Sequence, residues 1–514
     1  MSAGARPSFG PGERPGAPTG DAVHPRPAIG AGLAAALVFG SSAAVLVVEI
    51  VALRLLAPYL GLTLETSTLV IGLALAAIAG GSWIGGRWAD ERDSRGMLGP
   101  LLGTSGAVVA ATPFVLRGAG SAAGGAYLLL AAAATIIVPG LLLSAVTPIV
   151  TKLRLASLAD TGSVVGRLSG IGTTGAILGT VLTGFVLISR VPVTWIMVGL
   201  GILLALAGLV VEVGRRRRGG IIAAAVLVVG GLGAGVAPSA CDAETAYHCA
   251  VVEADPDRET GRRLVLDNLW HSYVDVEDPT YLEFGYVRSL AAAVEARFPT
   301  GQPIEAHHLG GGGLTLPRYL AETRPGTRST VSEIDPGVVD VDVERLGLEV
   351  GPDLEVRVED ARLGIRRVES RSLDLVVGDA FGGVSVPWHL TTREALAEVE
   401  RVLKADGLYA ANIIDHEPLA FARAKVGTLA TLFDHVAVAA PPEATEGRGG
   451  GNLVVLASDA PLDSAAWQSE MDELDVGWAL LDGARLDAWV GDVPMLTDDY
   501  APVDQLLTPY ATRS

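Results

Sequence analysis

Cysteine is nearly absent from this chain of 514 residues, which contains only Cys241 and Cys249. Two cysteines cannot form a disulfide framework or a cysteine-rich zinc site, so both classes of protein are excluded. Positive charge is scarce in residues 241–514, which hold 22 Lys and Arg against 48 Asp and Glu. Because contacts with phosphates need a basic face, this half is not expected to bind nucleic acid.

The first half of the chain is basic and apolar. It holds 16 Lys and Arg against 9 Asp and Glu, and the mean hydropathy of the whole chain, +0.42, is too high for an ordinary water-soluble enzyme. Residues 1–27 are rich in Pro, Gly and Ala, which predicts a disordered tail and not a cleavable signal peptide. Seven apolar runs of membrane-spanning length then predict an α-helical multi-pass bundle of about seven spans over residues 28–240. The runs cover residues 30–56, 66–86, 97–116, 122–148, 164–188, 193–213 and 220–238.

The loops between these runs predict the orientation in the membrane. Thirteen basic residues fall on one side: Arg6, Arg14, Arg26, Arg87, Arg92, Arg95, Lys152, Arg154, Arg167 and Arg215 to Arg218. Only Arg54, Arg117 and Arg190 fall on the other side. By the positive-inside bias we expect a cytoplasmic N-terminus, and seven spans then leave residues 241–514 outside the cytoplasm.

One carboxylate, Glu49, lies well inside a predicted span, with Arg54 nearby. Such a pair is either structural or part of a transport path, and the structural interpretation is favoured. The segment "GGRWADERDSR" (85–95) resembles the loop between the second and third spans of major facilitator transporters. Since those have twelve spans and this chain has about seven, an anchor or a reduced bundle is favoured over a working carrier.

The C-terminal half alternates between strand and helix patterns. Residues 241–280 predict a small β-meander, with "DPDRETG" as a turn. Residues 281–514 predict repeated strand–helix units, and hence a mostly parallel sheet covered by helices on both faces. The linker "PPEATEGRGGG" predicts an antiparallel final pair of strands.

Ligands of such sheets bind at the carboxyl ends of the strands. Four features fall there: the loop Gly310, Gly311, Gly312 and Gly313, then Glu333, Asp360 and Asp379. Glycines let a backbone approach a ligand, and a carboxylate about 23 positions after the loop suits ribose hydroxyls. The sequence therefore predicts a nucleoside pocket. His307 and His308 on the first strand are expected to pack in the core.

Several motifs resemble those of spermidine synthases, the polyamine aminopropyltransferases. They are "LGGGG", "VSEIDPGVV", "VEDAR", "VVGDAF", "VPWHLTTREALAEVERVLKADG" and "LDNLWHSYVDVEDPTYLEFGYV". The segments "RLLAPYLG", "GTTGAILGTVLTGFVLI" and "LTDDYAPVDQL" are similar to fused MFS/spermidine synthase proteins. The resemblance implies a class I methyltransferase fold, which is Rossmann-like, for residues 281–514, behind a β-domain at 241–280.

The resemblance also implies roles for single residues. Glu333 would bind the ribose of decarboxylated S-adenosylmethionine, Asp360 the adenine amino group, and Asp379 would take the proton of the attacking amine. His271, Tyr281 and Glu283 match substrate-binding positions less closely, because the family has glutamine at the first. Two family aspartates are replaced, one by Gly313 and the second of the D-x-x-D pair by Gly382, which thins the amine site.

Three hypotheses follow. The first is a membrane-anchored aminopropyltransferase that uses decarboxylated S-adenosylmethionine, and the second is a methyltransferase that uses S-adenosylmethionine. The third is a non-catalytic membrane protein whose outer domain binds a small ligand. No metal is expected, a small amine and the lipid bilayer are the expected partners, and the oligomeric state is open, although proteins of this family often oligomerise. The expected location is the cell membrane.

Overall fold

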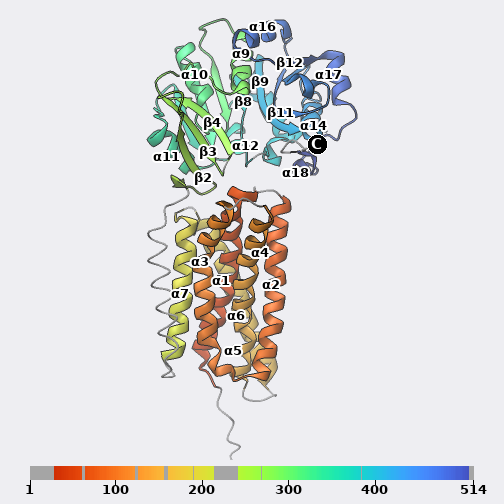
Figure 1. Ribbon diagram of the computed structural model, residues 1–514. Helices are drawn as coiled ribbons and strands as arrows, with labels where there is room; N and C mark the ends of the chain where they lie inside the picture. Colours follow the sequence, from red (N-terminus) through yellow and green to blue (C-terminus); the bar gives the residue numbers. More distant parts are fainter. Residues whose placement is uncertain are drawn as a thin grey trace, which may run out of the picture.

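The protein has an N-terminal helical bundle and a C-terminal α/β domain at one end of it, as a computed structural model shows (Figure 1). The structure describes residues 28–60, 64–121, 125–155, 160–188, 190–213, 241–267, 269–383 and 385–508.

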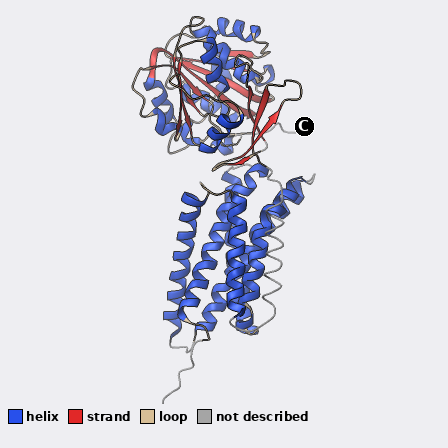
Figure 2. Ribbon diagram, turned by 90° about the vertical axis from the view of Figure 1, so that its left-hand side faces the viewer, coloured by secondary structure: helices blue, strands red, loops and turns tan. Residues whose placement is uncertain are grey.

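The bundle contains six helical segments long and apolar enough to cross a membrane, among the residues described. They run roughly parallel to one another along the long axis of the molecule (Figure 2). Their helices are α1 (Ala31–Leu60), α2 (Leu64–Glu91), α3 (Leu98–Ser121), α4 (Gly125–Ser144) with α5 (Val146–Arg154), α6 (Thr161–Leu182) with the π-helical η3 (Thr183–Leu187), and α7 (Val193–Val213). Six of the predicted apolar runs are therefore helices. The seventh, at 220–238, lies outside the described residues.

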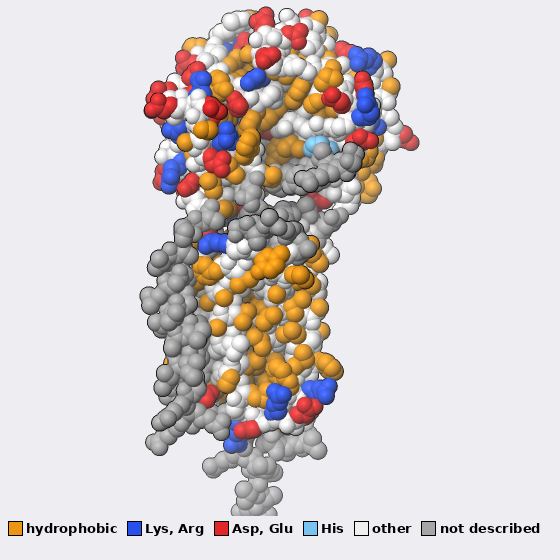
Figure 3. Space-filling model, in the orientation of Figure 1, with side chains coloured by type: hydrophobic (Ala, Val, Ile, Leu, Met, Phe, Trp, Pro, Cys, Tyr) orange, Lys and Arg blue, Asp and Glu red, His pale blue; other side chains and the backbone are white. Residues whose placement is uncertain are grey.

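The outer surface of the bundle is apolar. Leu75, Phe185 and Leu203 expose 58%, 78% and 65% of their residue surface. Such exposure would be unfavourable in water and is expected against lipid. Hydrophobic side chains cover the middle of the bundle, and charged ones gather at the end far from the C-terminal domain (Figure 3). The ion pair between Lys152 and Asp90 lies among the charged groups of α5 and α2. This distribution is that of a membrane protein.

A small antiparallel sheet stands between the bundle and the rest of the C-terminal domain (Figure 1). Its strands pair in chain order: β1 (Ala243–Glu244), β2 (Cys249–Ala254), β3 (Gly261–Leu266) and β4 (Leu269–Asp275). A disulfide joins Cys241 and Cys249 and closes the β1–β2 hairpin. The inner face of the sheet packs on α11 (Pro336–Arg345) through Leu264, Leu266 and Val338.

An eight-stranded sheet forms the centre of the C-terminal domain, in the order β12-β10-β11-β9-β8-β5-β6-β7. The strands are β5 (Glu305–Leu309), β6 (Arg328–Glu333), β7 (Leu354–Val358), β8 (Leu373–Gly378), β9 (Leu403–His416), β10 (His435–Ala440), β11 (Gly450–Ser458) and β12 (Ala479–Asp482). Strands β5 to β9 are parallel to one another, whereas β11 is antiparallel to both β9 and β10. This is the strand order and direction of the class I methyltransferase fold. The predicted antiparallel final pair corresponds to β10 and β11, and the edge strand β12 was not predicted.

Helices cover both faces of this sheet because its strands are buried on both sides. Leu375 and Val377 of β8 belong to the core under α9, α10 and α16, whereas Val376 between them belongs to the core under α13, α14 and α17, as the twofold alternation of a strand requires. The helices are α9 (Gly285–Arg297), α10 (Thr315–Thr323), α11 (Pro336–Arg345), α12 (Ala361–Ile365), α13 (Arg393–Val402), α14 (Ala420–Leu429), α15 (Pro442–Thr445), α16 (Ser464–Glu473), α17 (Gly483–Val490) and α18 (Val503–Leu506), with short 3-10 turns η1 (Ser94–Gly96) and η4 (Trp388–Leu390).

Candidate functional site

The glycine loop after β5 is held by close backbone contacts. Gly310 has φ +105°, and a Cβ atom there would lie 2.4 Å from the carbonyl oxygen of Asp379. Only glycine fits this conformation and this approach without strain. The loop backbone therefore passes directly over the carboxyl ends of β5 and β8.

Glu333, the last residue of β6, lies beside this loop. Its Oε2 accepts a hydrogen bond from the Gly311 amide at 2.8 Å, and its Oε1 accepts one from the Asp335 amide at 2.8 Å. Burial raises the pKa of the Glu333 carboxyl, and the two amide donors act against that rise. A carboxylate fixed in this way still has lone pairs that can accept hydrogen bonds from a ligand's hydroxyls.

Asp360 lies two residues after the end of β7 and immediately before α12. Its Oδ1 accepts from the Leu363 amide at 3.0 Å, so it caps the helix. Its Oδ2 lies 2.9 Å from Nε2 of His389, in the loop that also carries the exposed Trp388. Asp360 and His389 together line one end of the pocket.

Asp379 follows β8 and lies at the centre of the site. Asn412 of β9 donates from Nδ2 to Asp379 Oδ1 at 3.0 Å. The Tyr286 hydroxyl of α9, which donates to the His271 carbonyl oxygen at 3.5 Å, also favours the ionised form of this carboxyl. Burial raises the pKa of Asp379 to about 6, although Asn412, Tyr286 and the buried ammonium of Lys425 favour the ionised form. A carboxyl group with this pKa is suited to accept a proton near neutral pH.

Two cavities meet at Asp379. The smaller, about 100 Å³, is bounded by Glu333, Asp360 and His389, and the larger, about 530 Å³, extends toward α9 and β9. The residues that line both are His271, Gly310, Gly311, Gly312, Asp379 and Phe381. A ligand that binds over the glycine loop would therefore place its middle at the junction, next to the Asp379 carboxylate.

The larger cavity is mainly apolar and carries no lysine or arginine among its lining residues. Aromatic rings of Trp270, Phe284, Tyr286, Phe381 and Trp478 form much of its wall. Glu283 is its carboxylate besides Asp379, and the hydroxyl of Tyr281 donates to Glu283 Oε2 at 2.5 Å. The cavity thus suits a cation with an apolar body.

Of the two predicted substrate-binding residues His271 and Tyr281, only His271 lines the cavities. The His271 ring lines both cavities, and burial lowers its pKa to about 4, so it is neutral at physiological pH. Tyr281 lines neither cavity and acts on Glu283. His307 and His308 lie in the sheet, where burial lowers their pKa to about 4 and about 3, although His308 also reaches the wall of the larger cavity.

The two glycines that replace family aspartates have different environments. Gly313 has φ +73°, its amide donates to the buried Asp342, and a Cβ atom would lie 2.0 Å from Oγ of Ser272. Gly382 is exposed in a turn, and the nearest atom to an added Cβ, the Ser385 oxygen, lies 3.9 Å away. A carboxylate is sterically excluded at Gly313 and accommodated at Gly382.

Sequence reasoning missed the groups that surround Asp379 and Glu333. Asn412 is a polar residue inside an otherwise apolar strand, "LYAANIID", and that break in pattern was the available signal. Tyr286 and Ser272 gave no such signal. The Ser272 hydroxyl is buried in the wall of the larger cavity with no hydrogen-bond partner among the described residues, which indicates a position for a ligand atom.

Comparisons with known proteins point to one group. No family model matches the chain. A segment of 153 residues, 28% of this chain, is 33% identical to the polyamine aminopropyltransferase of Vibrio vulnificus (strain CMCP6), and the match spans half of that protein's length.

Two solved structures are similar to the C-terminal part. A probable spermidine synthase from Corynebacterium glutamicum ATCC 13032 is 28% identical, with 52% of this chain and 99% of that chain covered at a TM-score of 0.48. The spermidine synthase of Thermotoga maritima is 17% identical, with 54% and 83% covered at a TM-score of 0.34. Given the sequence identity to the Vibrio protein, this segment is homologous to the polyamine aminopropyltransferases, the spermidine synthases, and the described part of the same chain also contains six apolar helices.

Proposed function

We propose that this protein is a membrane-anchored aminopropyltransferase that transfers the aminopropyl group of decarboxylated S-adenosylmethionine to an amine. The observation that carries the proposal is the position of Asp379, at the junction of the cavity bounded by Glu333 and Asp360 and the larger cavity that contains Glu283. Homology to polyamine aminopropyltransferases supports the same reaction.

The smaller cavity would hold the nucleoside of the donor. The Glu333 carboxylate accepts hydrogen bonds from the ribose hydroxyls, and Asp360 faces the adenine end. The glycine loop lets the sulfonium lie against the backbone near Asp379. The Asp379 carboxylate near the sulfonium would also stabilise its positive charge.

The transfer step forms one bond and breaks one. The neutral amine nitrogen attacks the methylene carbon next to the sulfonium, and the carbon–sulfur bond breaks with its electron pair going to sulfur. Methylthioadenosine leaves, and the proton of the new secondary ammonium passes to Asp379. Asn412 holds the carboxylate toward the attacking nitrogen.

The acceptor would occupy the larger cavity. Since Gly382 replaces the second carboxylate of the family pair, one charge at Asp379 faces the reacting nitrogen, and Glu283 is the other negative group in reach of the cavity. We expect an acceptor with one reacting amine on an apolar body to be preferred over a short linear diamine.

Calorimetry on the full-length protein in detergent tests the choice of donor. We expect decarboxylated S-adenosylmethionine and methylthioadenosine to bind with similar affinity, and S-adenosylmethionine at least about ten-fold more weakly, because no lysine or arginine lines the larger cavity to meet its carboxylate. Tighter binding of S-adenosylmethionine would reject the aminopropyl donor.

Methyl transfer from S-adenosylmethionine is the second candidate, and one observation favours it. Gly313 and the unpartnered Ser272 hydroxyl are neutral where the family places a carboxylate against the donor's amine. S-adenosylmethionine carries its own carboxylate, so its affinity is reduced less by this change than that of the decarboxylated donor. Release of S-adenosylhomocysteine with an amine present would identify this reaction.

The sidedness of the C-terminal domain is also a proposal: we place it outside the cytoplasm. Val213 ends α7 at the bundle end far from the C-terminal domain, whereas Ala243 lies near it, which supports an odd number of crossings (Figure 1). The Cys241–Cys249 disulfide supports an oxidising compartment. The donor would then have to be present on that side of the membrane.

Labelling with a membrane-impermeant maleimide in intact cells tests this placement. A cysteine introduced at Asp257, in the exposed turn of the small sheet, should react without permeabilisation. A cysteine at Asp93, in the loop after α2, should react only after permeabilisation. The reverse pattern would place the catalytic domain in the cytoplasm, beside the source of sulfonium donors.

A further inference from the structure

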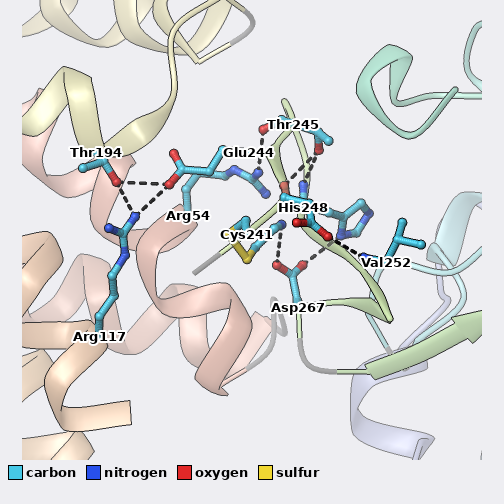
Figure 4. Close-up of a disulfide and its surroundings, with 11 residues drawn as sticks. Arg54, Arg117, Thr194, Cys241, Glu244, Thr245, His248, Val252 and Asp267 are labelled. Atoms are coloured by element: carbon cyan, nitrogen blue, oxygen red, sulfur yellow. Dashed lines mark hydrogen bonds and ion pairs between the residues drawn. A yellow bond between two sulfur atoms is a disulfide. The ribbon is translucent and has the colours of Figure 1, made fainter. Parts of the chain in front are cut away.

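The β1–β2 hairpin connects the membrane bundle to the nucleoside pocket. Its residues 243–250 touch three membrane helices on one side (Figure 4). On the other side they touch Asp335, two residues after Glu333. The contacts on each side are polar and specific in geometry, and they run through a segment of only eight residues.

On the membrane side, arginines from two spans hold the hairpin. The Arg54 guanidinium of α1 donates to the carbonyl oxygens of Tyr247 and of Thr245, the second at 3.2 Å. Arg117 of α3 forms an ion pair with Glu244 at 2.8 Å, and the Thr194 hydroxyl of α7 donates to the same carboxylate oxygen at 3.1 Å. The expected pairing of Arg54 with Glu49 is replaced by this contact.

These contacts explain two of the three basic residues that depart from the positive-inside distribution. Arg54 and Arg117 lie at the bundle end that carries few basic residues, and both are used to bind the hairpin. Arg190 at the same end is exposed. The charges of Arg54 and Arg117 are therefore explained by docking of the C-terminal domain and not by topology.

On the pocket side, the hairpin binds Asp335. The Thr245 hydroxyl and the Tyr247 amide, at 3.3 Å, both donate to Asp335 Oδ2. Asp335 is fully buried, caps α11 through the Gly337 amide, and its own amide donates to Glu333 Oε1 at 2.8 Å. Arg54 is therefore connected to the Glu333 carboxylate through two residues, Thr245 of the hairpin and Asp335.

The same hairpin also supplies a wall of the pocket. His248 lines the smaller cavity, and its Nδ1 lies 2.8 Å from Asp267 Oδ2. The next residue, Cys249, donates its amide to Asp267 Oδ1 at 2.9 Å and carries one end of the disulfide. The position of the His248 ring therefore depends on the closed hairpin.

We propose that Arg54 is a positioning residue for the nucleoside pocket: the membrane bundle, through Arg54 and the Arg117–Glu244 pair, holds the hairpin where Asp335 and His248 complete the ribose side of the site. The bundle is then part of the binding machinery as well as an anchor. The consequence for the ligand rests on the proposed nucleoside donor.

The test uses the full-length protein in lipid nanodiscs. We compare Arg54→Gln with Arg54→Lys, which keeps a charged donor, and with Arg190→Gln, a matched arginine at the same end. Hydrogen exchange is followed in peptides covering residues 243–250 and 331–338, and in β11 as an internal control. Calorimetry then gives the affinity for methylthioadenosine.

For Arg54→Gln we expect exchange to rise about ten-fold in both peptides and not in β11, with methylthioadenosine bound about ten-fold more weakly. Arg54→Lys should recover most of both effects, and Arg190→Gln should match the wild type. Unchanged exchange in residues 331–338 overturns the inference, as does an equal effect of Arg190→Gln.

A second variant, Glu244→Gln, and the ligand-free exchange measurement cover two cases in which the first comparison fails. If Arg54→Gln does not fold, Glu244→Gln removes the second anchor, and the same rise in residues 331–338 is expected. Because the exchange measurement needs no ligand, it tests the positioning role even if the wild type binds no nucleoside. Absence of nucleoside binding by the wild type would reject the proposed function. The positioning role of Arg54 would then be tested by the hydrogen-exchange measurement alone.

Discussion

Asn412 donates a hydrogen bond from Nδ2 to Oδ1 of Asp379 at 3.0 Å, and Asn452 in turn donates to Oδ1 of Asn412 at 3.0 Å. The two asparagines lie on the neighbouring antiparallel strands β9 and β11. The antiparallel strand β11, through Asn452 and Asn412, therefore fixes the orientation of the Asp379 carboxylate.

The pH dependence of transfer should report the ionisation of Asp379. Burial raises its pKa to about 6, and the base acts when deprotonated, so kcat/KM should fall as pH decreases through about 6. Asn412→Ala removes a donor that favours the carboxylate and should move this acid limb to higher pH. An acid limb near pH 4 in both proteins would contradict the assignment.

Asp379→Asn should increase stability while it removes activity. A carboxyl whose pKa is raised on folding destabilises the folded state above that pKa, and this cost disappears below the unfolded value near 4. The variant should therefore melt at a higher temperature than the wild type at pH 8, and the difference should vanish by about pH 4. Equal melting temperatures at pH 8 would show that the carboxylate is well compensated there.

Glu333→Ala should weaken binding of methylthioadenosine by about 2–4 kcal/mol, since charge-assisted hydrogen bonds to two ribose hydroxyls are lost. Glu305→Ala is the matched control, because Glu305 is at the other end of a neighbouring strand and pairs with Arg328 at the surface. Calorimetry measures both affinities, and circular dichroism checks folding. Unchanged affinity in Glu333→Ala would make the glycine loop a simple turn.

The two missing aspartates should respond differently when restored. Gly382→Asp has space for its side chain and should fold normally and increase putrescine turnover, because a dication then meets two carboxylates. Gly313→Asp meets Ser272 and a positive φ, and should lose about 1–3 kcal/mol of stability. Thermal melting and steady-state assays of both variants separate the effects. A stable Gly313→Asp protein would show that the loop can rearrange.

The disulfide and the nucleoside should be linked. If a closed hairpin is needed for His248 to line the pocket, reduction of Cys241–Cys249 should weaken methylthioadenosine binding, and bound methylthioadenosine should slow reduction by a mild phosphine. Mass spectrometry of alkylated protein gives the rate. Reduction at the same rate with and without saturating ligand would disprove the linkage.

Much of the architecture could be predicted because its signals are local. Membrane-spanning helices need about twenty apolar residues, so they can be recognised in the sequence. Strands such as "LDLVVGD" end in polar residues at one edge of a parallel sheet. This rule places Glu333, Asp360 and Asp379 at the same edge, and in the structure all three line one cavity. The short edge strand β12 has four residues and little pattern, and it was missed.

The surroundings of the site were harder to predict because they come from distant parts of the chain. Asn412, Tyr286 and His248 reach the pocket from β9, α9 and the hairpin, and no spacing in the sequence relates them to Asp379 or Glu333. The contact of Arg54 with the hairpin joins residues 193 positions apart. A single sequence gives no signal for such pairs.

We propose that the C-terminal domain transfers an aminopropyl group with Asp379 as the base. The most direct test of this proposal is mass-spectrometric measurement of methylthioadenosine released from decarboxylated S-adenosylmethionine by the full-length protein, with a panel of apolar monoamines and putrescine. The account predicts amine-dependent release, matched mole for mole by the aminopropylated amine, faster with the monoamines, and lost in Asp379→Asn although the nucleoside still binds. No amine-dependent release from the wild type, or full activity in Asp379→Asn, would contradict it.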